Sequence, residues 1–319
     1  MLEATDLSAL LGPVVRGKVR DVYTPGAGPA PATVAEGALD ELVVLVATDR
    51  ISAFDRVLGC VAGKGQLLTG ISAWWSAQLA DVLASHVVAV PDPAVTVTRR
   101  CTPLPVEVVV RGYLTGSTST SVWTRYAAGE RVAYGIELPD GLEKDDPLPA
   151  PILTPTTKAP EGAHDEPLSS AAVVERGLVA APVWEAAVAA AHALFRRGSE
   201  LAAAAGLTLV DTKYELGLDA AGRLTLIDEV HTPDSSRFWR AGTTEHLDKE
   251  LLRLRYRAAG YRGEGEPPAL WPDLADQLRA AYGEVHERLV GRSPELAPGP
   301  DEARIEENLR RWLSDRSSG

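Results

Sequence analysis

The sequence predicts an α+β protein with two lobes. Two short β-branched runs, over residues 42–47 and 106–110, are typical of buried strands. Helical spacing of apolar residues covers the C-terminal end, and strands and helices do not alternate regularly along the chain. This order favours segregated sheets and helices over a βαβ arrangement. At 319 residues, the chain is long enough for one large domain or two intimate ones.

Local signals support the individual elements in chain order. An apolar lead-in covers residues 7–15, and glycines and prolines over residues 25–31 indicate a turn or an inserted loop. Apolar residues recur at helical spacing over residues 69–86, and a short helix is expected over residues 122–128. Many prolines and charges over residues 139–166 favour a long loop, and a loop of that length inside a globular chain is usually functional.

The second half of the chain carries clear helix boundaries and a hairpin signal. An alanine-rich helix is expected over residues 182–205, because Pro182 stands near its first turn and Gly206 follows its end. Strands over residues 207–211 and 223–228 are separated by a turn and predict a β-hairpin. The remaining expected helices cover residues 247–259, 271–290 and 302–313.

Composition excludes several classes of function. The formal net charge is −12, and a chain this acidic is not a general nucleic-acid binder, because neutralising phosphates requires a basic field. The two cysteines form no C-x-x-C pair, so neither a zinc ribbon nor a redox motif is expected. The N-terminus lacks a signal-peptide pattern and no apolar run approaches about 18 residues. We therefore expect a cytoplasmic protein without a membrane partner. The sequence leaves the oligomeric state open, with a monomer slightly favoured.

Three cations surround one glycine in the segment Arg16-Gly17-Lys18-Val19-Arg20. Gly17 lets the backbone approach a ligand closely, and Lys18 is a point charge suited to a phosphate oxygen. The segment is not a Walker A loop. An anion-binding loop and a basic surface turn are therefore equally good interpretations of these residues alone.

Carboxylates gather around one lysine in the expected hairpin. Asp211, Lys213 and Glu215 alternate along a strand, so their side chains share one face. Asp228 ends the next strand and adds a further carboxylate. Oxygen ligands with few histidines suit Mg²⁺. A surface salt-bridge ladder is the alternative and stabilises little, but charged groups at the ends of core strands favour a functional site.

Two further segments carry groups that bind anions. Asp234, Ser235 and Arg237 fall in a turn, where a guanidinium can bind a phosphate or carboxylate bidentately. An N-cap turn is an equally good interpretation of this segment. Arg111 leaves a core strand before a Gly/Ser/Thr turn, and Ser117 is expected at a helix start, where backbone N–H groups form an anion pocket.

Polar side chains also follow the first β-branched strand and occupy two later loops. These further candidates for substrate contacts are Asp49, Arg50, Ser52, Lys64 and Lys158. Lys64 stands in an expected flexible glycine loop. Lysine is rare in this arginine-rich chain, so each lysine indicates a place suited to a compact ammonium.

These motifs, taken in their order, resemble those of the SAICAR synthetase family. The stretches that carry the resemblance are 16–23, 47–55, 63–69, 109–117, 155–159, His164-Asp165, 211–215 and 228–239. It extends from about Leu11 to about Arg253. The resemblance implies an N-terminal ATP-binding lobe over residues 1–110, similar to the nucleotide-binding lobes of kinases and ATP-grasp enzymes. It implies a larger C-terminal lobe over residues 111–319 that ends in helices.

The resemblance also implies a reaction of purine biosynthesis. ATP, L-aspartate and the carboxylated aminoimidazole ribonucleotide CAIR would give SAICAR, ADP and phosphate, with ATP and Mg²⁺ as cofactors. A carboxylate does not react with an amine, because it is anionic and has no leaving group. Phosphorylation by ATP would make an acyl phosphate that the aspartate amine can attack. Such an enzyme works mainly by positioning and electrostatics.

Roles carry over by motif, residue by residue. The ATP phosphate loop matches Arg16, Gly17, Lys18 and Arg20, and the adenine-binding strand matches Glu107 and Val109. The Mg²⁺ ligands match Glu215 and Asp228, and the ribonucleotide phosphate clamp matches Arg111, Ser117 and Arg237. The residues that bind the imidazole and its carboxylate in the family correspond to Asp211, Lys213, Asp234 and Ser235. Asp211, Lys213 and Arg237 are expected to serve catalysis. Contacts with aspartate are expected among Asp49, Arg50, Ser52, Lys64 and Lys158.

Two departures from the family pattern and two other functions bear on this interpretation. The segment 118–121 lengthens the turn after Ser117. His231 replaces a residue that is often aliphatic or hydroxylic, and we expect it to support the site and not to act as a base.

Another ATP-dependent phosphotransferase would share the phosphate loop but would not need the clamp at Arg111 and Arg237. An inactive nucleotide-binding regulator would not need intact metal ligands.

Overall fold

The computed structural model describes residues 1–25, 41–117, 121–158, 165–299 and 301–317. Thr118 and His164, which the sequence motifs include, lie outside the described residues. The described chain mixes helices and strands, as the α+β class requires. It forms two compact units, the first made of residues 1–76, 86–100 and 249–319 and the second of residues 77–85 and 101–248.

The first unit contains one five-stranded antiparallel sheet and several helices. Its elements are α1 (Ser8–Leu11), β1 (Val14–Arg16), β2 (Arg20–Tyr23), β3 (Leu42–Ala47), β4 (Arg50–Ala53), β5 (Arg56–Cys60), α2 (Lys64–Gln78), β6 (Val87–Asp92), β7 (Val95–Arg99), α6 (Glu250–Ala258), α7 (Pro272–Val290) and α8 (Asp301–Ser317). The sheet order is β1-β2-β3-β7-β6, and β4 and β5 form a separate hairpin.

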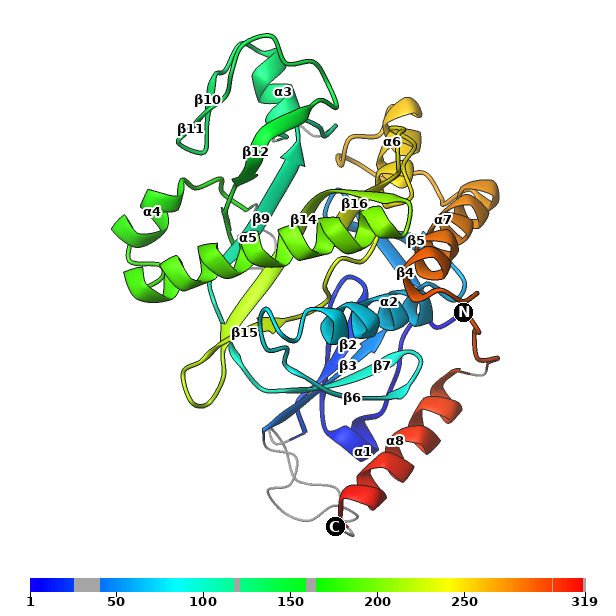
Figure 1. The fold of residues 1–319 in the computed structure, drawn as a ribbon. Coiled ribbons are helices and arrows are strands. Elements are labelled where there is room, and N and C mark those ends of the chain that lie inside the picture. The colour runs from blue at the N-terminus through cyan, green and yellow to red at the C-terminus, as the bar shows by residue number, and fades with distance from the viewer. Residues whose placement is uncertain (26–40, 118–120, 159–164, 300, 318–319) are drawn as a thin grey trace. The chain divides into compact units, whose positions relative to one another are not determined.

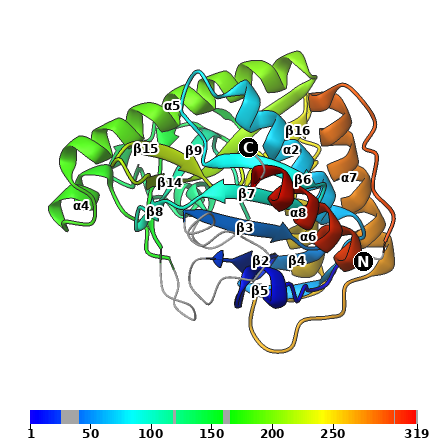
Figure 2. The same cartoon turned by 90° about the horizontal axis from the view of Figure 1, so that it is seen from below.

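The C-terminal helix completes the core of the first unit. Ile305, Leu309 and Leu313 follow each other at helical spacing on α8 and are buried with residues of β2, β3 and β7. Figure 2 shows α8 alongside β6 and β7. The sequence-based division placed a single boundary at residue 110. The first compact unit also includes residues 249–319, and the apolar face of α8 is buried against its strands.

The second unit is built on a seven-stranded sheet. Its elements are β8 (Thr102–Pro103), β9 (Val106–Tyr113), α3 (Val122–Ala127), β10 (Val132–Ala133), β11 (Ile136–Glu137), β12 (Pro147–Leu153), β13 (Thr156–Thr157), α4 (Ser170–Glu175), α5 (Ala181–Ala204), β14 (Leu207–Leu218), β15 (Leu224–Ile227) and β16 (Ser236–Arg240). The main path of the sheet is β12-β9-β14-β15, with β16 and β8 also paired to β14 and β13 paired to β9.

The long strand β14 organises this sheet. It pairs with β9, with β16 through its first half and with β15 through its second half. Helix α5 packs along β14 and β9 (Figure 1). A Cβ on Gly112 would lie only 3.2 Å from the Phe195 ring of this helix, so a residue without a side chain lets α5 approach β9. One face of the sheet is therefore covered by α5.

Several expected elements are confirmed. The strand expected over residues 42–47 is β3, the alanine-rich helix is α5, and the hairpin of β14 and β15 closes at a turn where Asp219 N–H donates to the Arg223 carbonyl over 3.0 Å. The short helix expected over residues 122–128 is α3. The three expected C-terminal helices are α6, α7 and α8.

The helix expected over residues 69–86 was misplaced. Helix α2 starts at Lys64, so the expected flexible loop around Lys64 is its first turn. A Cβ on Gly65 would lie 2.2 Å from the Ala47 carbonyl oxygen, so this turn is held by close packing against β3 that no local pattern reveals. The helix ends at Gln78, and Ser85 instead bridges to Leu226.

The long loop expected over residues 139–166 contains two strands, β12 and β13, both paired with β9. Prolines are common in this stretch. Among the described strands, β12 pairs only with β9 at the edge of the sheet, and edge strands tolerate proline. The segment around Asp234 is a turn that leads into β16 and not into a helix. The N-cap interpretation of that segment was therefore wrong.

Candidate active site

One face of the second unit's sheet carries a row of charged side chains. Alternate residues of β9 and β14, such as Val108 and Tyr214, are buried on the face that α5 covers. The intervening residues are on the opposite face. They are Glu107, Val109 and Arg111 on β9, and Asp211, Lys213 and Glu215 on β14. The structure thus brings together residues more than 100 positions apart in sequence.

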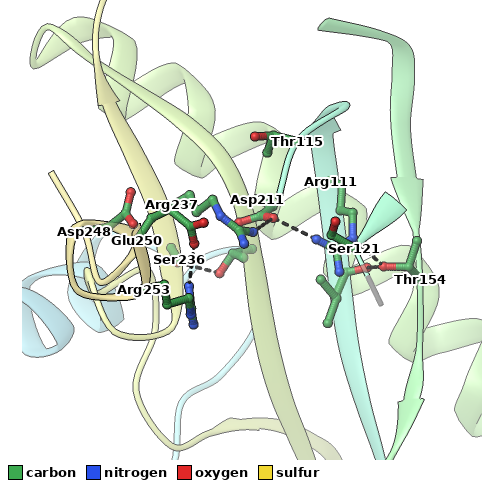
Figure 3. Close-up of polar contacts among 12 residues, drawn as sticks. Arg111, Thr115, Ser121, Thr154, Asp211, Ser236, Arg237, Asp248, Glu250 and Arg253 are labelled. Carbon is green, nitrogen blue, oxygen red and sulfur yellow. Dashed lines mark hydrogen bonds and ion pairs between the residues drawn. The ribbon is translucent and has the colours of Figure 1, made fainter. Parts of the chain in front are cut away.

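Asp211 lies between two arginines at one end of this row (Figure 3). It is directly opposite Arg111 on β9 and Arg237 on β16. Its Oδ2 accepts a hydrogen bond from Arg111 Nη1 at 2.9 Å and another from Arg237 Nη1. All three side chains are at most 13% exposed. We call these three residues the arginine cluster; its formal charge is +1, which suits a phosphate.

Thr154 and Ser121 add hydroxyl groups near the arginine cluster. The Thr154 hydroxyl accepts a hydrogen bond from Arg111 Nε at 3.0 Å and is fully buried, which fixes the orientation of that guanidinium. A Cβ on Gly116 would lie 2.4 Å from Ser121 Cβ and 3.7 Å from Arg237 Nη2. Gly116 therefore lets the serine and the arginine lie close together.

The helix after the Gly/Ser/Thr turn starts at a different serine from the one expected. Ser121 is the N-cap of α3 and accepts a hydrogen bond from Thr124 N–H at 3.3 Å. Ser117 is partly buried and lies before residues 118–120, which the structure does not describe. The N-cap is therefore Ser121 and not Ser117, because only the residue directly before the first helical turn can satisfy its free N–H groups.

Lys213 lies among carboxylates at the other end of the row. Its Nζ is 2.6 Å from Glu107 and 3.2 Å from Glu215, and Lys158 Nζ is 2.5 Å from the other oxygen of Glu215. Burial lowers the pKa of Lys213, but Glu215 and Glu107 more than offset this and leave the pKa above its ordinary value. Burial likewise raises the pKa of Glu215, and Lys213 and Lys158 outweigh it, so that the pKa is about 2. Lys213 and Glu215 are therefore both charged at neutral pH.

Asp228 follows β15 in a backbone conformation that is unusual for a residue with a side chain. Its φ is +64°, in the left-handed region, and such conformations cluster at functional sites. The preceding Ile227 is the partner of Glu215 in the sheet register, so the two carboxyl residues are near neighbours in the hairpin. Across the described part of the chain, no three His, Cys, Asp or Glu side chains form a group able to hold a metal. Two carboxylates still suit Mg²⁺, which commonly binds one or two carboxylates together with substrate phosphates.

Asp234 and Ser235 lie in the turn before β16. The Ser235 hydroxyl accepts a hydrogen bond from Thr232 N–H at 3.2 Å, and the Ser235 carbonyl accepts one from Lys213 N–H at 3.0 Å. Asp234 N–H donates to the Thr232 hydroxyl at 3.3 Å. The turn is thereby tied to the middle of β14, beside the charged row.

His231 is buried beside Tyr214 and helix α5. Its Nε2 lies 2.6 Å from the Tyr214 hydroxyl, and a Cβ on Gly198 of α5 would lie 2.3 Å from its ring. Complete burial lowers the pKa of His231 to about 3. The imidazole is therefore neutral at physiological pH.

The basic segment around Gly17 forms the turn of the β1–β2 hairpin in the first unit. Gly17 N–H donates to the Arg20 carbonyl at 2.8 Å, and Arg16 Nη2 donates to the Thr5 carbonyl at 3.1 Å. Lys18 lies 2.5 Å from Asp55, with both side chains more than half exposed. An exposed pair of this kind is weak. A cavity of about 1010 Å³ borders the turn.

The remaining candidates for substrate contacts in this unit are mostly buried. Asp49 accepts hydrogen bonds from Leu2 N–H at 2.9 Å and Gly65 N–H at 3.2 Å. Ser52 is 9% exposed and Lys64 is fully buried. Arg50 contacts the turn around Gly17. Lys158, the fifth candidate, belongs to the second unit.

The family model described as SAICAR synthetase matches residues 13–268. The phosphoribosylaminoimidazole-succinocarboxamide synthase of Legionella pneumophila (strain Paris) is 43% identical, over 97% of this chain and 98% of the relative. The chain belongs to the SAICAR synthetase family.

Other SAICAR synthetases agree with this assignment. The chloroplastic phosphoribosylaminoimidazole-succinocarboxamide synthase of Arabidopsis thaliana is 41% identical, over 94% of this chain and 72% of the relative. The solved structure of SAICAR-synthase from Saccharomyces cerevisiae complexed with SAICAR has a TM-score of 0.76 at 30% identity, covering 92% of this chain and all of the yeast chain. The expected family, the α+β fold and the ATP-dependent ligase activity in purine biosynthesis are confirmed. Within the described residues, no helix is long and apolar enough to cross a membrane.

Three residues that contact the predicted site residues were not predicted from the sequence. Thr154 stands in what was taken for a loop, and nothing local marks it as the partner of Arg111. Ser121 is recognisable only once the start of α3 is known. Asp21, which binds Arg50 at 2.8 Å and is fully buried, had a visible signal, because an acidic residue on the inner face of a strand needs a partner.

Proposed function

We propose that the chain joins L-aspartate to the carboxylate of CAIR at the expense of ATP, through an acyl-phosphate intermediate. The observation that carries this proposal is the charged row on β9, β14 and β16, where a net cationic arginine cluster lies at one end and Lys213 lies among carboxylates at the other. A reaction that combines a phosphorylated nucleotide, a nucleoside triphosphate and a dicarboxylic acid needs such separate sites for anions.

The proposed reaction has two steps, phosphorylation of the CAIR carboxylate and formation of the amide bond. A carboxylate oxygen of CAIR attacks the γ-phosphorus of ATP, and the bond to the β-γ bridging oxygen breaks to release ADP. The aspartate amine then attacks the carbonyl carbon of the acyl phosphate. Inorganic phosphate leaves, the nitrogen loses a proton, and an amide bond remains. The first step gives the carboxylate a leaving group, which a bare carboxylate lacks.

The arginine cluster would bind the 5′-phosphate of CAIR. Arg111 and Arg237 already share Asp211, which orients both guanidiniums and leaves a net positive charge. Charge-assisted hydrogen bonds from arginine to phosphate are short and directional. Ser117, Asp234 and Ser235 would complete the binding of the nucleotide and its imidazole.

Lys213 would stabilise the negative charge of the reacting carboxylate and the transferred phosphoryl group. Its ammonium stays protonated because its pKa is raised above the ordinary value by two carboxylates. Lysine serves here as a fixed charge and not as a base. Positioned charges of this kind supply most of the rate in phosphoryl transfer.

Glu215 and Asp228 would hold Mg²⁺. Mg²⁺ neutralises phosphate oxygens and favours the departure of ADP. Glu215 is engaged by Lys158 and Lys213, so these ammoniums must release at least one of its oxygens when the metal and ATP bind.

ATP would bind with its phosphates at Arg16, Gly17, Lys18 and Arg20 and its adenine along Glu107 and Val109. Asp49, Arg50, Ser52, Lys64 and Lys158 were the candidates for aspartate; of these, the partly exposed Lys158 is the one we retain as a direct contact. We place the reaction in the cytoplasm, with small molecules as the partners of the chain.

The test is the substrate requirement for ADP release by the purified protein. ADP should form only when CAIR and aspartate are both present, in equal amounts with SAICAR. ADP formed with CAIR and an alcohol in place of aspartate would instead indicate a small-molecule kinase. No ADP release under any of these conditions would indicate a nucleotide-binding protein without activity.

A further inference from the structure

Arg50 stands at the start of β4 and directs its side chain to the turn between β1 and β2. The guanidinium donates to the carbonyl oxygens of Glu3, of Gly17 at 3.0 Å and of Lys18 at 3.2 Å, and to Asp21 Oδ1 at 2.8 Å. A guanidinium has five N–H donors, so four of them are already used. The side chain is 12% exposed. Arg50 thus binds protein groups and has little surface left for a small substrate.

The carboxylate that receives Arg50 is itself held in place. Asp21 is fully buried, and its second oxygen accepts hydrogen bonds from Thr5 N–H at 2.7 Å and the Thr5 hydroxyl at 3.1 Å. The Thr5 hydroxyl lies 2.9 Å from the Tyr23 hydroxyl, which accepts a hydrogen bond from Leu7 N–H at 3.0 Å. The N-terminal segment and β2 therefore fix the position of the arginine.

Three successive carbonyl groups of the turn accept hydrogen bonds from Arg50 or Thr48. Gly17 and Lys18 are bound by Arg50, and the Val19 carbonyl accepts hydrogen bonds from Thr48 N–H at 3.0 Å and the Thr48 hydroxyl at 2.8 Å. In a planar trans peptide, the N–H of the next residue points opposite to the carbonyl. The N–H groups of Lys18 and Val19 therefore point away from Arg50, and the N–H group of Arg20 points away from Thr48. Successive N–H groups on one side of a turn form a site for an anion.

We propose that Arg50 is a positioning residue of the ATP phosphate loop, which it shapes by binding the carbonyl side of that loop. This inference rests on the proposed function, in which the turn around Gly17 binds the phosphates of ATP. It differs from the expectation that Arg50 contacts aspartate. Its charge is balanced by Asp21, so its effect on ATP comes through the backbone of residues 17–20 and not through direct attraction.

The experiment compares Arg50→Ala and Arg50→Lys with a matched control, Arg56→Ala. Arg56 is an exposed arginine on β5, in the same hairpin as Arg50. The KM values for ATP, CAIR and aspartate and the kcat are measured for each protein. Binding of Mg²⁺ and a non-hydrolysable ATP analogue is measured separately by calorimetry, because that measurement does not require the reaction.

We expect both Arg50 variants to raise the KM for ATP and weaken analogue binding by about tenfold or more, since charge-assisted hydrogen bonds are lost. The KM values for CAIR and aspartate should stay close to those of the wild type. Added guanidinium ion should restore part of the analogue binding of Arg50→Ala and leave Arg56→Ala unchanged. Arg50→Lys keeps the charge beside Asp21, so it tests the loop even if Arg50→Ala does not fold.

Two results would overturn the positioning role. A rise confined to the KM for aspartate would make Arg50 a substrate contact. Equal losses in kcat, in all three KM values and in analogue binding, with no effect of guanidinium, would show that Arg50 only stabilises the fold. Absence of SAICAR formation by the wild-type protein would contradict the proposed function instead, and analogue binding by the variants would then still decide the role of Arg50.

Discussion

Asp211 of β14 and Arg111 of β9 face each other directly in the sheet, with Oδ2 2.9 Å from Nη1. The same oxygen binds Arg237 from the strand on the other side of β14. One carboxylate therefore contacts two largely buried guanidiniums. We therefore expect a bound anion to stabilise the arginine cluster when the charge of Asp211 is removed.

Asp211→Asn should destabilise the protein by about 3 kcal/mol, because two largely buried cations lose their counter-charge. Inorganic phosphate or CAIR should restore part of the loss, since an anion replaces the missing carboxylate. The measurement is a thermal unfolding curve with and without phosphate. Asp140→Asn is the control, because Asp140 is 88% exposed in its pair with Arg131. Equal responses of the two variants to phosphate would contradict the binding of an anion at the arginine cluster.

Arg237→Lys should raise the KM for CAIR by about tenfold, because lysine keeps the charge but loses the planar fork that binds phosphate and Asp211 together. The KM for ATP should change little. Steady-state kinetics with each substrate varied in turn provides the measurement. A change limited to the KM for ATP would remove Arg237 from the proposed CAIR site.

Asp228→Asn should raise the Mg²⁺ concentration needed for half-maximal activity and reduce turnover strongly. Asparagine also adopts a positive φ readily, so the backbone at +64° can be kept while the charge is lost. A Mg²⁺ titration at saturating substrates measures the effect. If the Mg²⁺ dependence equals that of the wild type, Asp228 is not a metal ligand.

The buried His231 should make the protein less stable in acid. Its pKa is about 3 in the folded protein, against an ordinary value of 6.5. Below pH 6.5 the unfolded chain binds a proton that the folded state excludes, so the contribution is complete above pH 6.5 and is lost as the pH falls towards 3. The slope approaches about 1.4 kcal/mol per pH unit.

Urea unfolding at a series of pH values tests this prediction by comparing the wild type with His231→Asn. The variant should be less stable at neutral pH, since it loses the contact with Tyr214. Its stability should nevertheless fall less steeply below pH 6.5, because asparagine binds no proton. Parallel curves for the two proteins would show that His231 is protonated in the folded state.

Local patterns predicted much of the secondary structure and several side-chain faces. The β-branched run of β3, the boundaries of α5 and the hairpin of β14 and β15 were all recognisable, because each depends on residues adjacent in sequence. The alternation of Asp211, Lys213 and Glu215 placed them on one face before any strand partner was known. The start of α2 and the strands within residues 139–166 were not recognisable, since both depend on packing against distant β3 and β9.

The sequence by itself determined the family, the class of reaction and the residue types available for binding anions and a metal. Only the tertiary structure decided which of these residues meet. Arg111, Asp211 and Arg237 form one cluster because the registers of β9 and β16 against β14 align them. Arg50 faces the carbonyl side of the Gly17 turn because β4 starts beside the β1–β2 hairpin. Strand register and the partners of a long side chain depend on contacts between distant segments, which local propensity does not encode.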